Sequence, residues 1–90
     1  MEMVHYKIEV SGRVQGVGFR YSARNEAVRL GIKGFVKNLP GGHVYLEIEG
    51  SPEQTDKMIQ WCRTGPSTGW VDNLQLWQGE LVGFENFSIR

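Results

Sequence analysis

The sequence predicts a small α+β domain in which two helices cover one face of an antiparallel sheet. Its 90 residues, 40% of them hydrophobic, are enough to bury one core. Short runs with alternating apolar residues predict strands, and two longer runs with apolar residues at helical spacing predict helices. Their order is β-α-β-β-α-β with an additional C-terminal strand, and this order is common in the ferredoxin-like sandwich. We expect residues 1–90 to form this single domain.

The first strand and the first helix are predicted from two different periods. Apolar side chains alternate with Lys7 and Glu9 across residues 5–11, as in a strand with one buried face. Residues 20–30 carry Ala23 and Ala27 at helical spacing. Gly31 follows as the residue that ends this helix.

A hairpin and a second helix are predicted next. Residues 33–39 and 43–49 are strand-like runs around the turn signal Pro40-Gly41-Gly42. Ser51-Pro52-Glu53-Gln54 supplies an N-cap, a proline at the first helical position and a glutamine three residues after the cap. The helix is expected to bury one face and to end at Gly65-Pro66; that face is formed by Thr55, Met58, Ile59 and Cys62.

Two strands complete the predicted sheet. Residues 70–78 alternate imperfectly, and residues 84–89 offer a short final strand after Gly83. In such a sandwich, the loop after the first strand lies at one end of the sheet.

That loop carries a motif that predicts an anion site. Between the first strand and the first helix the sequence reads Gly12-Arg13-Val14-Gln15-Gly16-Val17-Gly18-Phe19-Arg20. Glycines let successive backbone N–H groups turn toward one point, and a helix start adds unpaired N–H groups. A cation at the N-terminus of a helix destabilises the helix by about 0.3–1 kcal/mol unless an anion is bound. A bound phosphate would therefore explain why an arginine, Arg20, stands at this position. The alternative is a glycine-rich connection that only packs tightly, with Arg20 solvated.

Cofactor and metal motifs are not matched. Tyr21 occupies the third glycine position of a dinucleotide fingerprint, and the spacing of a Walker A motif is also wrong. His5 and His43 show no ligand spacing, and Cys62 is the only cysteine. We therefore expect no cofactor, no metal and no disulfide, with Cys62 as a small buried hydrophobe.

Charge and hydropathy limit the classes of partner that this chain can have. Ten Lys and Arg balance ten Asp and Glu, which argues against nucleic-acid and anionic-membrane partners. No apolar run approaches the ~20 residues that span a bilayer, and residues 1–10 lack a secretory hydrophobic stretch. We expect a cytoplasmic monomer.

Three segments carry a family resemblance: residues 12–20, Gly34-Phe35-Val36-Lys37-Asn38, and Phe87-Ser88-Ile89-Arg90. Together they resemble acylphosphatases, essentially from end to end. The resemblance implies a ferredoxin-like enzyme that hydrolyses small acyl phosphates to a carboxylate and inorganic phosphate without a metal. It also implies that Arg20 and Asn38 are the catalytic pair.

The sequence departs from the family at three positions. Ala23 stands where many members have threonine, and Phe35 where many have tryptophan. Gly18 replaces a larger residue of animal members, so we expect a more mobile loop. None of these changes removes a catalytic group, although Ala23 makes any role of a hydroxyl at that position doubtful.

The chemistry of acyl phosphates suits these residues. We expect the substrate phosphoryl group to be bound by the Arg20 guanidinium and by the backbone N–H groups of Gln15, Gly16, Val17, Gly18, Phe19 and Arg20. The Asn38 carboxamide would orient water without deprotonating it. Taken without the resemblance, Asn38 before Leu39-Pro40 is an ordinary turn residue.

Two binding modules are the alternatives to an enzyme. Lys33-Gly34-Phe35 resembles the start of an RNA-binding signature, but Val36 and Lys37 do not continue it. A phosphate-sensing module without turnover, as in the larger hydrogenase-maturation proteins, would keep the loop and lose the reaction.

Overall fold

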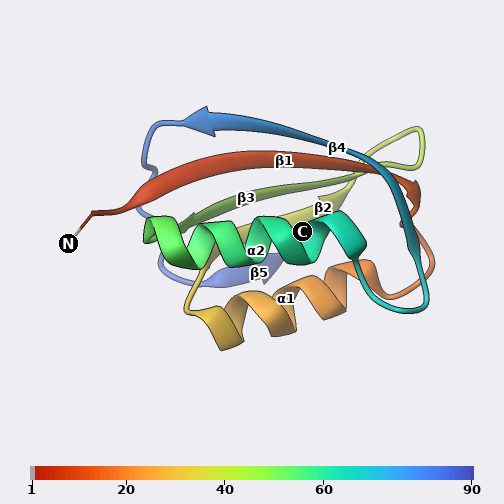
Figure 1. The fold of residues 1–90 in the computed structure, drawn as a ribbon, viewed down its shortest axis with the longest axis horizontal. Coiled ribbons are helices and arrows are strands. Elements are labelled where there is room, and N and C mark those ends of the chain that lie inside the picture. Colours follow the sequence, from red (N-terminus) through yellow and green to blue (C-terminus); the bar gives the residue numbers. More distant parts are fainter. Residues whose placement is uncertain (1) are drawn as a thin grey trace.

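The computed structural model describes residues 2–90, and its elements follow the predicted order (Figure 1). They are β1 (Val4–Arg13), α1 (Phe19–Leu30), β2 (Lys33–Asn38), β3 (Val44–Gly50), α2 (Pro52–Thr64), β4 (Trp70–Gly79) and β5 (Phe87–Ile89). The sheet order is β4-β1-β3-β2-β5, and both helices lie on the same face of the sheet (Figure 1). The predicted ferredoxin-like sandwich is therefore confirmed.

The additional strand β5 differs from the expected antiparallel arrangement. It pairs in parallel with β2, Gly34 opposite Phe87 and Val36 opposite Ile89, so the sheet is mixed. The chain leaves β4 at the end of the sheet where β2 begins, because β4 is antiparallel to β1. The short connection 80–86 then crosses to the other edge at that same end. β5 must consequently run in the direction of β2.

The core lies between the sheet and the two helices. Side chains without solvent exposure come from β1, β2, β3 and both helices: Ile8, Val10, Ala23, Ala27, Val36, Val44, Leu46, Ile48, Met58 and Cys62. Burial of a large aliphatic side chain contributes roughly 1.5–3 kcal/mol to stability. This packing fixes the start of α1 relative to the ends of β1 and β2.

The second helix begins and ends as its sequence predicts. The Gln54 N–H donates to Ser51 Oγ at 3.1 Å, and the Ser51 N–H donates to Gln54 Oε1 at 2.8 Å. This reciprocal capping box satisfies two backbone donors that the helix itself leaves unpaired. The helix then ends at Thr64, and Gly65 caps its C-terminus.

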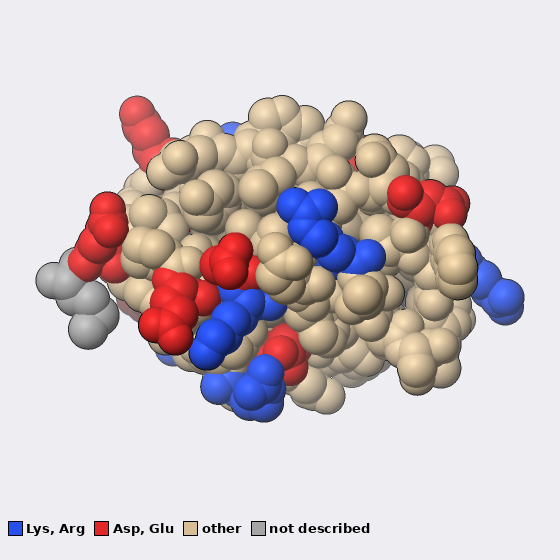
Figure 2. All heavy atoms as spheres, in the orientation of Figure 1, with Lys and Arg blue, Asp and Glu red and all other residues tan. Residues whose placement is uncertain are grey.

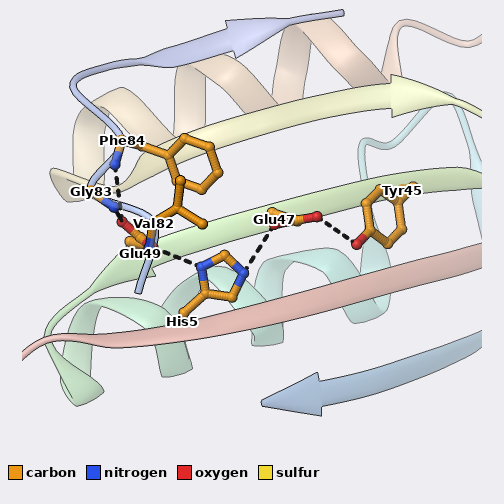
Figure 3. Close-up of polar contacts among 7 residues, drawn as sticks. All are labelled: His5, Tyr45, Glu47, Glu49, Val82, Gly83 and Phe84. Atoms are coloured by element: carbon orange, nitrogen blue, oxygen red, sulfur yellow. Dashed lines mark hydrogen bonds and ion pairs between the residues drawn. The ribbon is translucent and has the colours of Figure 1, made fainter. Parts of the chain in front are cut away.

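A buried carboxylate, Glu49, fastens the connection 80–86, which we name the strap (Figure 3). Its Oε2 lies 2.8 Å from Nδ1 of His5, itself 1% exposed. Glu49 also accepts hydrogen bonds from three N–H groups of the strap, those of Val82 (2.5 Å), Gly83 (3.0 Å) and Phe84 (3.1 Å). Burial alone would raise the pKa of Glu49, but these donors and His5 outweigh it and lower that pKa below its ordinary value.

The opposite side of the His5 ring faces a second carboxylate. His5 Nε2 lies 3.0 Å from Glu47 Oε1, although without hydrogen-bond geometry. Glu47 in turn accepts a hydrogen bond of 2.7 Å from the Tyr45 hydroxyl, continuing the network along β3 (Figure 3). Burial, together with the hydrogen bond to the Glu47 carboxylate, raises the pKa of Tyr45.

Candidate functional site

A hollow of about 140 Å³ lies where the β1–α1 loop, the first turn of α1 and the end of β2 meet. We name it the loop hollow; it is lined by Val14, Gly16, Gly18, Phe19, Arg20, Tyr21 and Asn38. β1 and β2 are both antiparallel to β3, so they run in the same direction and end at the same edge of the sheet. Val44 pairs with Val10 on one side and with Asn38 on the other. The sheet register thus brings Asn38 beside the loop.

The backbone of the loop contains two glycines with positive φ, which suits an anion cradle. Gly16 and Gly18 have φ angles of 74° and 79°. Among residues 2–90 only glycines have positive φ, so the φ angles of Gln15 and Val17 are negative. Alternation between the two hands turns successive N–H groups toward one side of the chain. Within residues 2–90 none of the N–H groups from Gln15 to Arg20 donates a hydrogen bond. The loop therefore offers a set of unpaired donors.

The guanidinium of Arg20 is uncommitted. Arg20 lies in the first turn of α1, which contains no acidic residue and has no side-chain cap. It is half-buried, and it forms no ion pair or hydrogen bond with other side chains of the described part of the chain. A positive charge at the positive end of a helix favours a bound anion at this position.

Three long-range hydrogen bonds from two side chains hold the loop in place, and no pattern in the sequence predicts any of them. Gln15 Nε2 donates to the carbonyl oxygens of Leu39 and His43, both at 2.8 Å. On the other flank Thr68 Oγ1 donates to the carbonyl of Val17 at 2.7 Å. Gln15 and Val17 do not line the loop hollow. The prediction that these two residues bind the phosphoryl group therefore concerns only their backbone N–H groups.

Asn38 and Tyr21 are the remaining polar groups of the hollow. Asn38 is the last residue of β2, and its carboxamide has no hydrogen-bond partner within residues 2–90. Sequence reasoning identified Asn38 but missed Tyr21, which follows Arg20 directly in α1 and also lines the hollow. The hollow thus combines a cation, a neutral amide and an aromatic ring.

The other reactive side chains are engaged elsewhere. His43 Nδ1 lies 2.6 Å from Glu9 Oε2, and His5 belongs to the network around Glu49. Cys62 is completely buried, as predicted, and burial raises the pKa of its thiol to about 12. In residues 2–90 there is no group of three or more His, Cys, Asp and Glu side chains that could hold a metal ion.

Charges of both signs share the face of the molecule that Figure 2 shows. Figure 2 shows acidic and basic side chains interspersed on the face toward the viewer, with no broad area of one sign. No helix within residues 2–90 has the length and apolar character needed to cross a bilayer. Because the formal net charge of the chain is zero, attraction of an anion would need a local source such as the loop and Arg20.

Comparison with known proteins gives one consistent result. The family model described as Acylphosphatase matches residues 6–89. A relative named Acylphosphatase from Anaeromyxobacter dehalogenans is 46% identical over 88 residues, covering 93% of this chain and 95% of the relative. The crystal structure of acylphosphatase from Bacillus subtilis has a TM-score of 0.94 and 34% identity, covering 97% of this chain and 98% of that one. The crystal structure of full-length HypF in its phosphate- and nucleotide-bound form has a TM-score of 0.92 and 31% identity, covering 99% of this chain but 12% of that one.

Proposed function

The chain belongs to the acylphosphatase family, and we propose that the loop hollow is its active site, with Arg20 and Asn38 as the catalytic residues. The match to the family model and to the relatives confirms the resemblance to acylphosphatases that the sequence shows. The enzyme hydrolyses the carboxyl–phosphate bond of acyl phosphates, giving a carboxylate and inorganic phosphate. One observation carries the assignment of the site: one hollow is lined by residues with an uncommitted guanidinium, an uncommitted carboxamide and the unpaired backbone N–H groups of Gly16 and Gly18.

The reaction demands little from acid–base groups. Water attacks phosphorus in line with the leaving group, a new P–O bond forms, and the bond to the acyl oxygen breaks. The leaving carboxylate has a conjugate acid with a pKa of roughly 4, so it needs no protonation. The proton of the attacking water ends on the phosphate product. What the protein must supply is positioning and stabilisation of negative charge.

Arg20 is proposed to bind the phosphoryl oxygens together with the loop N–H groups. A guanidinium presents its donors as a planar fork, which matches two oxygens of one phosphoryl group. From its place in the first turn of α1, Arg20 would stabilise charge on the equatorial oxygens as the leaving group departs. Gln15 and Thr68 support this role, because their hydrogen bonds hold the two sides of the loop.

Asn38 is proposed to orient the attacking water. A carboxamide can accept a hydrogen bond from water through its oxygen and donate one to the phosphoryl group through its nitrogen. Its place at the end of β2 rather than on the loop supports separate roles for the two residues: Arg20 holds the phosphoryl group and Asn38 holds the nucleophile.

We further propose that the enzyme acts as a monomer in the cytoplasm. One copy of the chain supplies every residue that lines the loop hollow, and the lone cysteine suits a reducing compartment. Sedimentation at micromolar concentration tests the first statement.

The decisive experiment is hydrolysis of benzoyl phosphate in the presence of a chelator, followed by its ultraviolet absorbance. Arg20→Ala and Arg20→Lys should both lose turnover and should no longer be inhibited by inorganic phosphate, because neither side chain provides the planar pair of donors of a guanidinium. Asn38→Ala should lose about 10²–10³ in kcat, as for one positioned donor, while phosphate still inhibits.

Matched controls separate the site from general damage. Arg29→Ala removes a cation from the same helix, where Arg29 is paired with Glu26, and should leave kcat unchanged. Near-normal turnover by Arg20→Lys would refute bidentate binding. A protein that binds phosphate through Arg20 without hydrolysing either benzoyl or acetyl phosphate would be a sensing module.

A further inference from the structure

The size of the loop hollow separates the phosphoryl group from the rest of the substrate. Its volume of about 140 Å³ lies well below the ≈ 300–1,000 Å³ of pockets that enclose whole organic ligands. If the phosphoryl group and the attacking water occupy the hollow, as in the proposed function on which this inference rests, the acyl group must lie at its rim. The residues of the rim then decide which acyl groups are accepted.

Tyr21 is the exposed aromatic side chain of that rim. Two aromatic residues line the hollow, but Phe19 is 2% exposed and belongs to the core, whereas Tyr21 is 62% exposed. Side chains on a helix lean toward its N-terminus, so a residue of the first turn of α1 leans toward the loop. The core therefore does not account for the position of Tyr21.

The ring of Tyr21 is held by a second side chain. Arg24, one turn further along α1, is half-buried, and its guanidinium lies 5.4 Å from the centre of the ring. A cation–π contact of this kind limits the motion of the ring and occupies one of its faces. An aromatic ring with one face occupied by Arg24 keeps a second face for a planar apolar group.

We propose that Tyr21, positioned by Arg24, forms the acyl-group subsite and makes the enzyme prefer acyl phosphates with a flat, apolar acyl group. An aromatic acyl group can stack offset or meet the ring edge-on, which a methyl group cannot do. The substrates compared differ in the acyl group and share the same phosphoryl group. The preference therefore does not depend on the proposed roles of Arg20 and Asn38.

The test compares kcat/KM for benzoyl phosphate and acetyl phosphate. Tyr21→Ala should lower the value for benzoyl phosphate by about 2- to 12-fold, the range given by one aromatic pair, and change that for acetyl phosphate less than 2-fold. Tyr21→Phe should retain the preference, because it retains the ring. Val28→Ala, at another exposed position of α1, should leave the ratio unchanged.

A second readout does not need turnover. The wild type should bind phenylphosphonate more tightly than methylphosphonate by calorimetry, and Tyr21→Ala should remove this difference while inorganic phosphate binds as before. An unchanged ratio in Tyr21→Ala, or an equal loss with both substrates, overturns the inference. Failure of the wild type to hydrolyse either acyl phosphate would refute the proposed catalytic roles instead. The ratio of phenylphosphonate to methylphosphonate affinity would still test the role of Tyr21, because it does not depend on turnover.

Discussion

Replacement of Glu49 by glutamine should destabilise the fold by loosening the strap 80–86. In the wild type each carboxylate oxygen accepts hydrogen bonds, Oε1 from Gly83 and Phe84 and Oε2 from Val82. A glutamine keeps one acceptor oxygen, so at least one N–H of the strap faces an NH₂ group and loses its partner, at about 1–3 kcal/mol. The remaining bonds lose the strength that a charged acceptor gives. We expect a loss of about 2–4 kcal/mol in the free energy of unfolding at pH 7.

The same carboxylate makes this loss depend on pH. The pKa of Glu49 is lower in the folded protein than its ordinary value, so folding favours the ionised form. Its contribution is complete above the unfolded pKa, near 4.3, and disappears as pH falls through the folded value. Glutamine does not titrate. The difference in stability between wild type and Glu49→Gln should therefore be largest at neutral pH and shrink below about pH 4.

Urea unfolding followed by tryptophan fluorescence at several pH values between 3 and 7 measures both effects. Glu85→Gln is the matched control, because Glu85 lies in the same strap but is exposed, and it should change stability by less than about 0.5 kcal/mol. A Glu49→Gln variant as stable as the wild type at pH 7 would refute the anchoring role. A stability difference that stays constant down to pH 3 would refute the assigned direction of the pKa.

Two further predictions concern the loop and the buried thiol. Gly16→Ala and Gly41→Ala each place a side chain at positive φ, 74° and 93°, with open space around the new Cβ, so both should lose about 1–2 kcal/mol of stability. Only Gly16→Ala should also weaken inhibition by inorganic phosphate; equal phosphate inhibition in the two variants would argue against the loop as the phosphate cradle. Cys62 should react with a thiol reagent at the rate of global unfolding, because it is completely buried and the pKa of its thiol is raised to about 12. Rapid labelling of the native protein at pH 8 would show that this region opens locally.

Local chemistry explains what could be predicted from the sequence. The second helix is defined by interactions over three residues, between Ser51 and Gln54, and its boundaries agree with the capping box. The glycines at 16 and 18 permit the positive φ that both adopt, wherever the loop lies in the fold. Arg20 was marked by its place in the first turn of a helix. Each of these features depends on neighbours within one turn of the chain, so periodicity and residue type suffice to find it.

Tertiary structure decided the features that join distant segments. The parallel pairing of β5 with β2 follows from the path of the strap, which no local pattern specifies. Gln15 reaches two carbonyl groups of the β2–β3 turn, and Asn38 reaches the loop through pairing with Val44. From sequence alone Asn38 was an ordinary turn residue, and the resemblance to a family was what marked it. Such contacts depend on which strands become neighbours, because a sheet brings together residues far apart in the chain. The sequence therefore determined the parts of the candidate site, and the fold determined which of them meet in one hollow.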